Sequence, residues 1–223
     1  MRGIIGYNSC MEDYIVPARI ARAEINVLNS RFIASAAPAE TVDAAREFIA
    51  RMRAEFADAS HNVPAFVIGH GNSVITHCSD DGEPSGTAGR PALAVLSGSG
   101  LGDVVVVITR FFGGTRLGTG GLVRAYSDAV RSVLEVLPRA RRVPCLTAML
   151  AIPYNWFERL KLLVETHHGT VVDQQFAADV TLTMQFPVAT YQAFCQALTE
   201  ASHASLAPEI IETSEQLVPV ENA

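Results

Sequence analysis

The feature that most constrains the fold is a run of five β-branched residues at positions 104–108, four valines followed by an isoleucine. A strand with one face in water alternates apolar and polar residues, whereas a strand buried on both faces reads as a continuous apolar run. The run therefore predicts the central strand of a sheet that other elements cover on both faces.

The segments before residue 138 alternate between strand and helix periodicity. Apolar residues recur at three- and four-residue spacing from Val42 to Phe56, and Pro38 and Thr41 precede them as helix start signals. The predicted elements are strands at 23–28, 31–36, 62–68, 74–78 and 104–108, and helices at 42–56, 88–96 and 122–137.

The residues after 138 form a second group. Two prolines and three arginines interrupt the periodicity at 138–144, which predicts a linker, and the residues beyond Ser214 carry no pattern and are expected to fray. Between them the order βαββαβ is typical of a ferredoxin-like domain. The predicted strands are 146–152, 170–175, 179–186 and 205–213, and the predicted helices are 155–167 and 188–201.

Together these patterns predict an α+β protein of two domains, at residues 13–138 and 143–216. The composition, 49% hydrophobic and 18% charged, is that of a globular chain. No apolar run approaches the roughly 18 residues that span a bilayer, and the first thirteen residues lack the apolar segment of an export signal. We expect neither a membrane span nor export; the sequence leaves open whether Met1 or Met11 is the start.

The four cysteines, Cys10, Cys78, Cys145 and Cys195, lie far apart and form no CxxC pair. This spacing argues against a disulfide framework and against a structural zinc site. Free thiols in a reducing compartment are expected, so the predicted localisation is cytoplasmic.

The net charge of −6 is unevenly distributed. Residues 1–140 carry 13 basic and 14 acidic side chains, and residues 141–223 carry 4 and 9. The chain therefore lacks the broad basic surface of a typical nucleic-acid binder, and it contains no DNA-specific motif. Contact with nucleic acid would depend on a local arginine patch.

Glycine is concentrated in one part of the chain, where eleven of the sixteen lie between Gly82 and Gly121. The last of them sit between the buried strand and a helix start, where free backbone N–H groups suit a phosphate or a carboxylate. Arg110, Arg116 and Arg124 would add donors. The candidate anion- or RNA-binding residues are these arginines with Gly113, Gly114, Gly118, Thr119, Gly120 and Gly121.

These glycines match the standard nucleotide-binding motifs only in part. Gly113 and Gly118 have P-loop spacing, but Thr119 stands where the lysine should be. Gly118 and Gly120 begin a dinucleotide fingerprint, but Val123 replaces its third glycine. We do not expect ATP or NAD to bind through these loops. The alternative is that the glycines only permit close packing of strand and helix.

An acidic loop accompanies the glycines. Asp80, Asp81 and Glu83 offer carboxylates for a magnesium ion, although a solvated acidic turn explains them as well and no cofactor is expected elsewhere. His61 with Asn62, or His77 with Cys78, could serve acid-base or nucleophilic chemistry. Neither pair forms a known catalytic motif, so catalytic residues remain unassigned.

Five strings in their order along the chain resemble the IMPACT family, and within it the bacterial YigZ-like branch. The strings are NSRF at 29–32, SHN at 60–62, SDDGEPSGTAG at 79–89, TRFFGG at 109–114 and LGTGGLVRAY at 117–126. The resemblance covers roughly residues 13–138. It implies a first domain with the left-handed βαβ architecture of a ribosomal small-subunit protein (the domain 2-like fold), and a second domain similar to the last domain of elongation factor G.

Three hypotheses for the function follow. The first is a non-catalytic cytosolic factor linked to translation or its regulation, which contacts RNA, the ribosome or a translation protein through the surface formed by residues 80–89 and 110–126. The second is an enzyme or sensor for a small anionic, phosphorylated ligand with magnesium. The third is a protein-interaction module in which the second domain pairs through a sheet edge or binds a regulatory ligand. The sequence does not give the oligomeric state.

Overall fold

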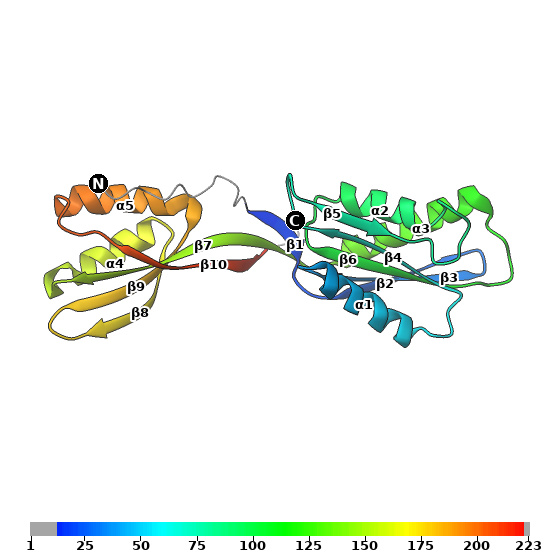
Figure 1. Ribbon diagram of the computed structural model, residues 1–223, viewed down its shortest axis with the longest axis horizontal. Coiled ribbons are helices and arrows are strands. Elements are labelled where there is room, and N and C mark those ends of the chain that lie inside the picture. Colours follow the sequence, from blue (N-terminus) through cyan, green and yellow to red (C-terminus); the bar gives the residue numbers. More distant parts are fainter. Residues whose placement is uncertain (1–12, 221–223) are drawn as a thin grey trace. The chain divides into compact units, whose positions relative to one another are not determined.

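A computed structural model describes residues 13–220, so Met1, Cys10 and Met11 lie outside the described residues. The chain divides into two compact units. The first unit contains residues 14–141 and 218–220, and the second contains residues 142–217 together with Asp13. Each unit has a sheet and helices of its own (Figure 1).

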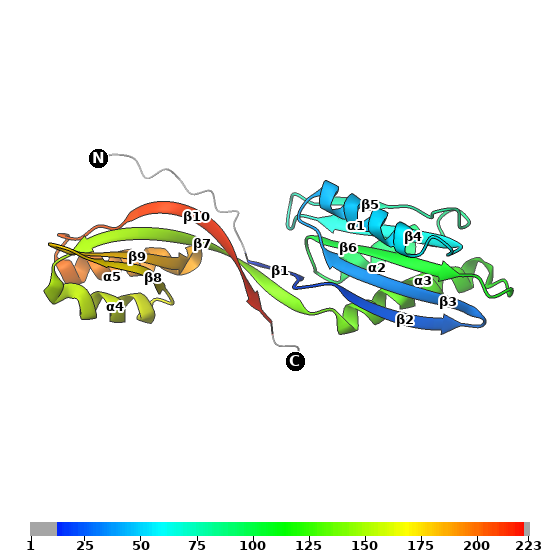
Figure 2. The same ribbon diagram turned by 90° about the horizontal axis from the view of Figure 1, so that it is seen from below.

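The first unit is built on a sheet of five antiparallel strands in the order β2-β3-β6-β4-β5 (Figure 2). Because β3 and β4 both pair with β6 and run antiparallel to it, they are parallel to each other, and α1 connects them. The strands are β2 (Ala21–Val27), β3 (Ser30–Pro38), β4 (His61–Ile68), β5 (Ile75–Cys78) and β6 (Val104–Phe111).

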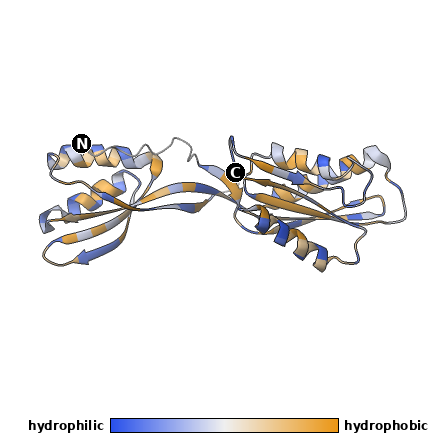
Figure 3. Ribbon diagram, in the orientation of Figure 1, coloured by the Kyte–Doolittle hydropathy of each residue, from blue (hydrophilic) through white to orange (hydrophobic). Residues whose placement is uncertain are grey.

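The prediction of a central strand buried on both faces is confirmed by β6. Val104, Val106 and Ile108 pack into a core with α2 and α3, whereas Val105 and Val107 pack into a separate core with α1. All five side chains have no exposed surface. Figure 3 shows the central strands of this sheet almost entirely in the hydrophobic colour.

Three helices cover the sheet, with α1 on one face and α2 and α3 on the other (Figure 1). The bounds are α1 (Val42–Glu55), α2 (Gly89–Gly98) and α3 (Gly118–Val136). Thr41 caps α1 as predicted, since its hydroxyl accepts from the Ala44 N–H at 3.1 Å. The structure starts α3 at Gly118 rather than at residue 122, because the glycines of its first turn have low helix propensity and concealed the start from the sequence pattern.

The second unit has the ferredoxin-like order. Its strands are β7 (Arg139–Ile152), β8 (Thr170–Phe176), β9 (Val180–Pro187) and β10 (Glu209–Pro219), paired in the order β10-β7-β9-β8. The short β1 (Tyr14–Pro17) also pairs with β7. Its helices are a short 3₁₀ turn η1 (Tyr154–Trp156), α4 (Phe157–Thr166) and α5 (Val188–Ser202), and a core of aliphatic and aromatic side chains lies beneath α4 and α5.

Two predictions for this unit were wrong. Residues 139–144 are not an irregular linker but the first part of β7, and the residues beyond Ser214 are not frayed but continue β10 to Pro219. A pair between the strands explains both errors, because the Arg142 Nη1 donates to Glu215 Oε2 at 2.7 Å. One arginine of the cluster that suggested a linker is thus paired with a carboxylate on the neighbouring strand.

Candidate functional site

The Asp80 side chain holds the acidic loop in place through hydrogen bonds to its backbone. Its carboxylate accepts N–H groups from Gly86 at 2.8 Å, Ala88 at 3.1 Å and Gly89 at 2.8 Å. Burial alone would raise the pKa of Asp80, but these three bonds and the charge of Arg90 outweigh it and leave that pKa below its usual value. The side chain therefore closes the loop and caps the start of α2.

Asp81 ties the same loop to α1 and β4. Its Oδ1 accepts from Arg53 Nη2 at 2.6 Å, and its Oδ2 accepts from the Asn62 N–H at 2.7 Å. The backbone carbonyl of Asp81 lies 2.8 Å from His61 Nδ1, and the residue adopts φ +46°. The Asn62 side chain accepts from the Thr109 hydroxyl at 2.7 Å, so His61 and Asn62 anchor the loop.

Glu83 is buried beneath the loop and belongs to a charged network. Its Oε1 accepts from Arg110 Nη1 at 2.6 Å and from the Tyr126 hydroxyl at 2.7 Å. His61 Nε2 lies 3.8 Å from the same oxygen. Burial, reinforced by the hydrogen bond to Glu83, raises the pKa of Tyr126 well above its usual value, so the phenol stays a donor.

The three acidic residues therefore face different partners. In the part of the chain that the structure describes, no group of three His, Cys, Asp or Glu side chains is placed to hold a metal ion. Both oxygens of Asp80 and of Asp81 already accept hydrogen bonds. A magnesium ion at Asp80, Asp81 and Glu83 stays a prediction, and it would have to break these bonds because the present arrangement does not fit it.

A cavity of about 320 Å³ lies at the start of α3. Gly118 has φ +71°, and no side chain caps the helix. The N–H groups of the first turn, which have no partner inside a helix, therefore point toward this end without a side-chain acceptor. The cavity is lined by Glu83, Pro84, Arg110, Phe112, Arg116, Leu117, Gly118, Thr119 and Leu122.

The glycines of the cluster divide into two kinds. A Cβ on Gly89 would lie 2.7 Å from the backbone of Ser79, and a Cβ on Gly113 would overlap the backbone of Asn29, so close packing explains these two. A Cβ on Gly114, Gly118 or Gly120 would meet nothing within 4 Å. Positive φ accounts for Gly114 and Gly118, but neither packing nor dihedral accounts for Gly120.

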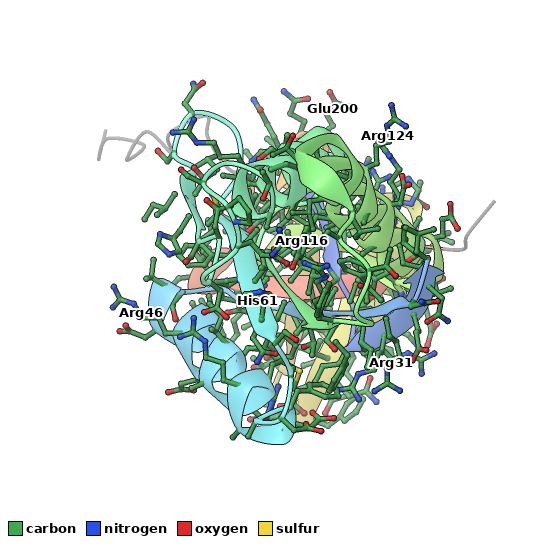
Figure 4. The ribbon with its side chains drawn as sticks, turned by 90° about the vertical axis from the view of Figure 1, so that its right-hand side faces the viewer. Arg31, Arg46, His61, Arg116, Arg124 and Glu200 are labelled. Carbon is green, nitrogen blue, oxygen red and sulfur yellow. The ribbon has the colours of Figure 1, made fainter. Side chains whose placement is uncertain are left out.

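The three candidate arginines have different surroundings, and Figure 4 labels two of them, Arg116 and Arg124. Arg110 is 5% exposed, and its Nε has no hydrogen-bond partner among residues 13–220. Arg116 and Arg124 are exposed, and Arg116 lines the cavity.

His77 and Cys78, one of the two pairs considered for catalysis, pack in different surroundings. His77 packs against the Phe66 ring at a centroid distance of 5.2 Å, whereas Cys78 belongs to the side chains packed against the core of α2 and α3. Burial, with a smaller effect of Asp80, raises the pKa of the Cys78 thiol. This environment disfavours the thiolate that a nucleophile needs. Cys78, Cys145 and Cys195, the three cysteines in the described range, are free.

The sequence alone did not assign a role to Phe112 or Tyr126. Phe112 is 49% exposed and lies beside the cavity, with the Arg110 guanidinium 5.4 Å from its ring centroid. Tyr126 is fully buried and donates to Glu83. A tyrosine in an otherwise aliphatic helix stripe signals a buried hydrogen-bond partner, because its hydroxyl needs one.

Comparison with known proteins identifies the family. Residues 28–134 match the Impact N-terminal domain, and residues 150–205 match a domain of unknown function (DUF1949). The chain is 37% identical over 197 residues to the IMPACT family member YigZ of Escherichia coli (strain K12), a match covering 88% of this chain and 97% of that protein. The chain belongs to the IMPACT family.

Other relatives of this IMPACT-family chain agree. An IMPACT family member of Haemophilus influenzae (strain ATCC 51907 / DSM 11121 / KW20 / Rd) is 35% identical over 92% of this chain and all of that protein. A solved structure described as a hypothetical protein is 37% identical, with a TM-score of 0.60 over 91% of this chain and 98% of that one. None of the helices between residues 13 and 220 has the length and apolarity to span a membrane.

Proposed function

We propose that this IMPACT-family chain is a non-catalytic cytosolic factor linked to translation, and that it contacts RNA, free or on the ribosome, through the start of α3. The observation that carries the proposal is the exposed surface where uncapped helix N–H groups, the exposed Arg116 and the half-exposed Phe112 lie together, with Arg124 exposed further along α3. We call it the α3 surface and define it by Phe112, Arg116, Gly118–Gly121 and Arg124.

The chemistry of this surface fits single-stranded RNA. Helix N-termini and arginine guanidinium groups bind phosphate, and an exposed aromatic ring offers a face on which a base stacks. The net charge of the chain is negative, so binding depends on these few groups and is expected to be weak and sensitive to salt. The link with translation rests on the resemblance of both domains to domains of translation proteins.

The catalytic alternative has less support. An enzyme that uses magnesium at the acidic loop would need free carboxylates, but the oxygens of Asp80 and Asp81 already bind backbone and arginine donors. Glu83 is paired with Arg110 in the interior. These contacts support a loop that shapes a binding surface.

The first prediction tests the α3 surface by reversing one charge. Arg116→Glu should weaken binding to a single-stranded RNA about tenfold at low salt, because it removes a phosphate contact and adds repulsion. Arg116→Ala should lower the slope of log K against log salt by roughly 0.7, the value for one phosphate of a single strand. Filter binding and ribosome pelleting measure both effects.

Arg46→Glu is the matched control, since Arg46 is exposed on α1, on the other face of the sheet (Figure 4). It makes the same change of charge and should alter RNA binding much less. Equal losses for the two variants, or no association of the unaltered chain with RNA or ribosomes, would refute the proposed contact.

A further inference from the structure

Two independent features meet in the cavity at the start of α3. One is the uncapped first turn of this 19-residue helix, with Gly118 and Thr119 in the cavity wall. The other is Arg110, which lines the cavity, is 5% exposed and has no partner for its buried Nε among residues 13–220. A buried N–H without an acceptor is costly, so a ligand oxygen that reached it would be favoured.

The charges around the cavity favour an anion. Glu83 is the only acidic residue in the described wall, and its Oε1 already accepts from Arg110 and Tyr126. Arg116 also lines the cavity, and no described residue forms an ion pair with it. The Arg116 charge and the positive end of the helix are therefore not offset within the site.

The rest of the wall is apolar and comes from Pro84, Phe112, Leu117 and Leu122. A volume of about 320 Å³ exceeds what a phosphate group alone would fill and lies at the lower end of the range for small-molecule sites. The half-exposed ring of Phe112 offers a face for a planar group.

We propose that this cavity binds the terminal phosphate of a nucleotide, a phosphate monoester, with the attached organic group against Phe112 and Leu122. The proposal rests on the proposed function in one respect, since the 5′-phosphorylated end of an RNA is one source of this group and a free mononucleotide is the other. A monoester carries up to two negative charges and three acceptor oxygens, so it gains more from a helix N-terminus and an arginine than a diester does.

Gly120 has a role under this proposal. It lies in the first turn of α3, where alanine would fit without contact and would favour the helix more. Absence of a side chain lets a ligand approach the backbone N–H groups closely. Gly114 and Gly118 carry no such inference, because their positive φ already accounts for glycine.

The second prediction uses a pair of variants at one position. Thr119 lies in the cavity wall, and Thr119→Asp places a carboxylate at the helix start, where it should compete with phosphate; Thr119→Asn has nearly the same shape without the charge. Calorimetric titration with adenosine 5′-monophosphate should show affinity lowered at least ~10-fold by Thr119→Asp and less than ~3-fold by Thr119→Asn. Adenosine, which has no phosphate, should bind the unaltered chain at least ~10-fold more weakly than its monophosphate.

Two further measurements complete the test. One identifies the source of the phosphate monoester, and the other uses the unaltered chain, so a misfolded variant cannot affect it. A short RNA should bind more tightly with a 5′-phosphate than with a 5′-hydroxyl if RNA ends are the source; a preference for the mononucleotide alone assigns the site to a free nucleotide. Inorganic phosphate should shift the amide resonances of Gly118 and Gly120 in the unaltered chain, which requires no variant.

Equal binding of adenosine and its monophosphate, equal effects of the two Thr119 variants, or unshifted amides would overturn the proposal. RNA that binds without a preference for the 5′-phosphate, together with no binding of the mononucleotide, leaves the proposed function standing and removes the monoester site. Binding of the mononucleotide without any RNA binding leaves the monoester site standing and removes the proposed function.

Discussion

Gly89 and Gly120 both belong to the glycine-rich segment 82–121 but have opposite surroundings. The Cα of Gly89 faces the backbone of Ser79, and a Cβ there would lie 2.7 Å from its carbonyl. The Cα of Gly120 faces open space at the exposed start of α3. The fold therefore requires the first glycine and does not require the second, although the sequence presents them as members of one cluster.

The third prediction compares alanine at these two glycines. Gly89→Ala should lower the free energy of unfolding by about 1–3 kcal/mol, because the backbone of Ser79 must shift. Gly120→Ala should leave it unchanged or raise it by about 0.5–1 kcal/mol, the gain of alanine over glycine in a helix. Urea unfolding followed by circular dichroism measures both. A destabilising Gly120→Ala would show that folding, and not ligand access, accounts for this glycine.

The acidic residues show that a local sequence pattern does not predict the partners of individual side chains. Three carboxylates within four residues predicted a shared site or a solvated turn, whereas the structure gives each its own partners. The partner of Asp81 is Arg53 on α1, and the partners of Glu83 are Arg110 on β6 and Tyr126 on α3. Such contacts join segments far apart in sequence, and one sequence alone carries no spacing rule for them.

At the scale of elements, α2 depends on a carboxylate that lies outside it. Asp80 is nine residues before Gly89 and accepts the N–H groups of Ala88 and Gly89 at the helix start. Because the hydrogen bonds hold the folded pKa of Asp80 below its usual 3.8, the charged form stabilises the fold at pH values above 3.8, and this stabilisation is lost as the pH falls through the lowered pKa.

The fourth prediction follows from the lowered pKa of Asp80. Asp80→Asn should lower the free energy of unfolding by about 1 kcal/mol at neutral pH, because the amide removes the charge and turns an NH₂ donor toward one of the backbone N–H groups that Asp80 accepts. The difference between the two proteins should shrink once the pH is below the folded pKa, because the unaltered Asp80 is then protonated. Urea unfolding across the acidic range measures this. Asp58→Asn, at an exposed position, is the control for charge; an equal effect of Asp58→Asn would contradict the capping role.

The elements with a strong hydrophobic pattern could be predicted from the sequence. The ends of elements that depend on contacts with distant residues could not. The apolar run identified β6, and the helical spacing identified α1 with its cap at Thr41. The start of α3 was missed because glycine in a first turn resembles a loop. The length of β7 and β10 was missed because nothing in the sequence pattern revealed that Arg142 and Glu215 pair across these strands. The cavity depends on the missed start of α3, so only its residue types could be predicted.

At the scale of the whole molecule, the two units have separate cores. The first unit has one core on each face of its sheet, and the second has a single core beneath α4 and α5. The single tryptophan, Trp156, packs against the core of the second unit. Its fluorescence therefore reports on the second unit, whereas circular dichroism reports on both.

The fifth prediction uses this separation. Ile108 is fully buried in β6, and Ile108→Ala should lower the free energy of unfolding of the first unit by roughly 2–5 kcal/mol, through lost burial and the cavity left behind. In urea, the circular dichroism transition should move to lower concentration while the Trp156 transition stays in place. Leu182→Ala, at a fully buried position of β9, is the reciprocal control and should move the Trp156 transition. If Ile108→Ala moves both transitions equally, the units unfold as one, and binding at the α3 surface would then stabilise the second unit as well.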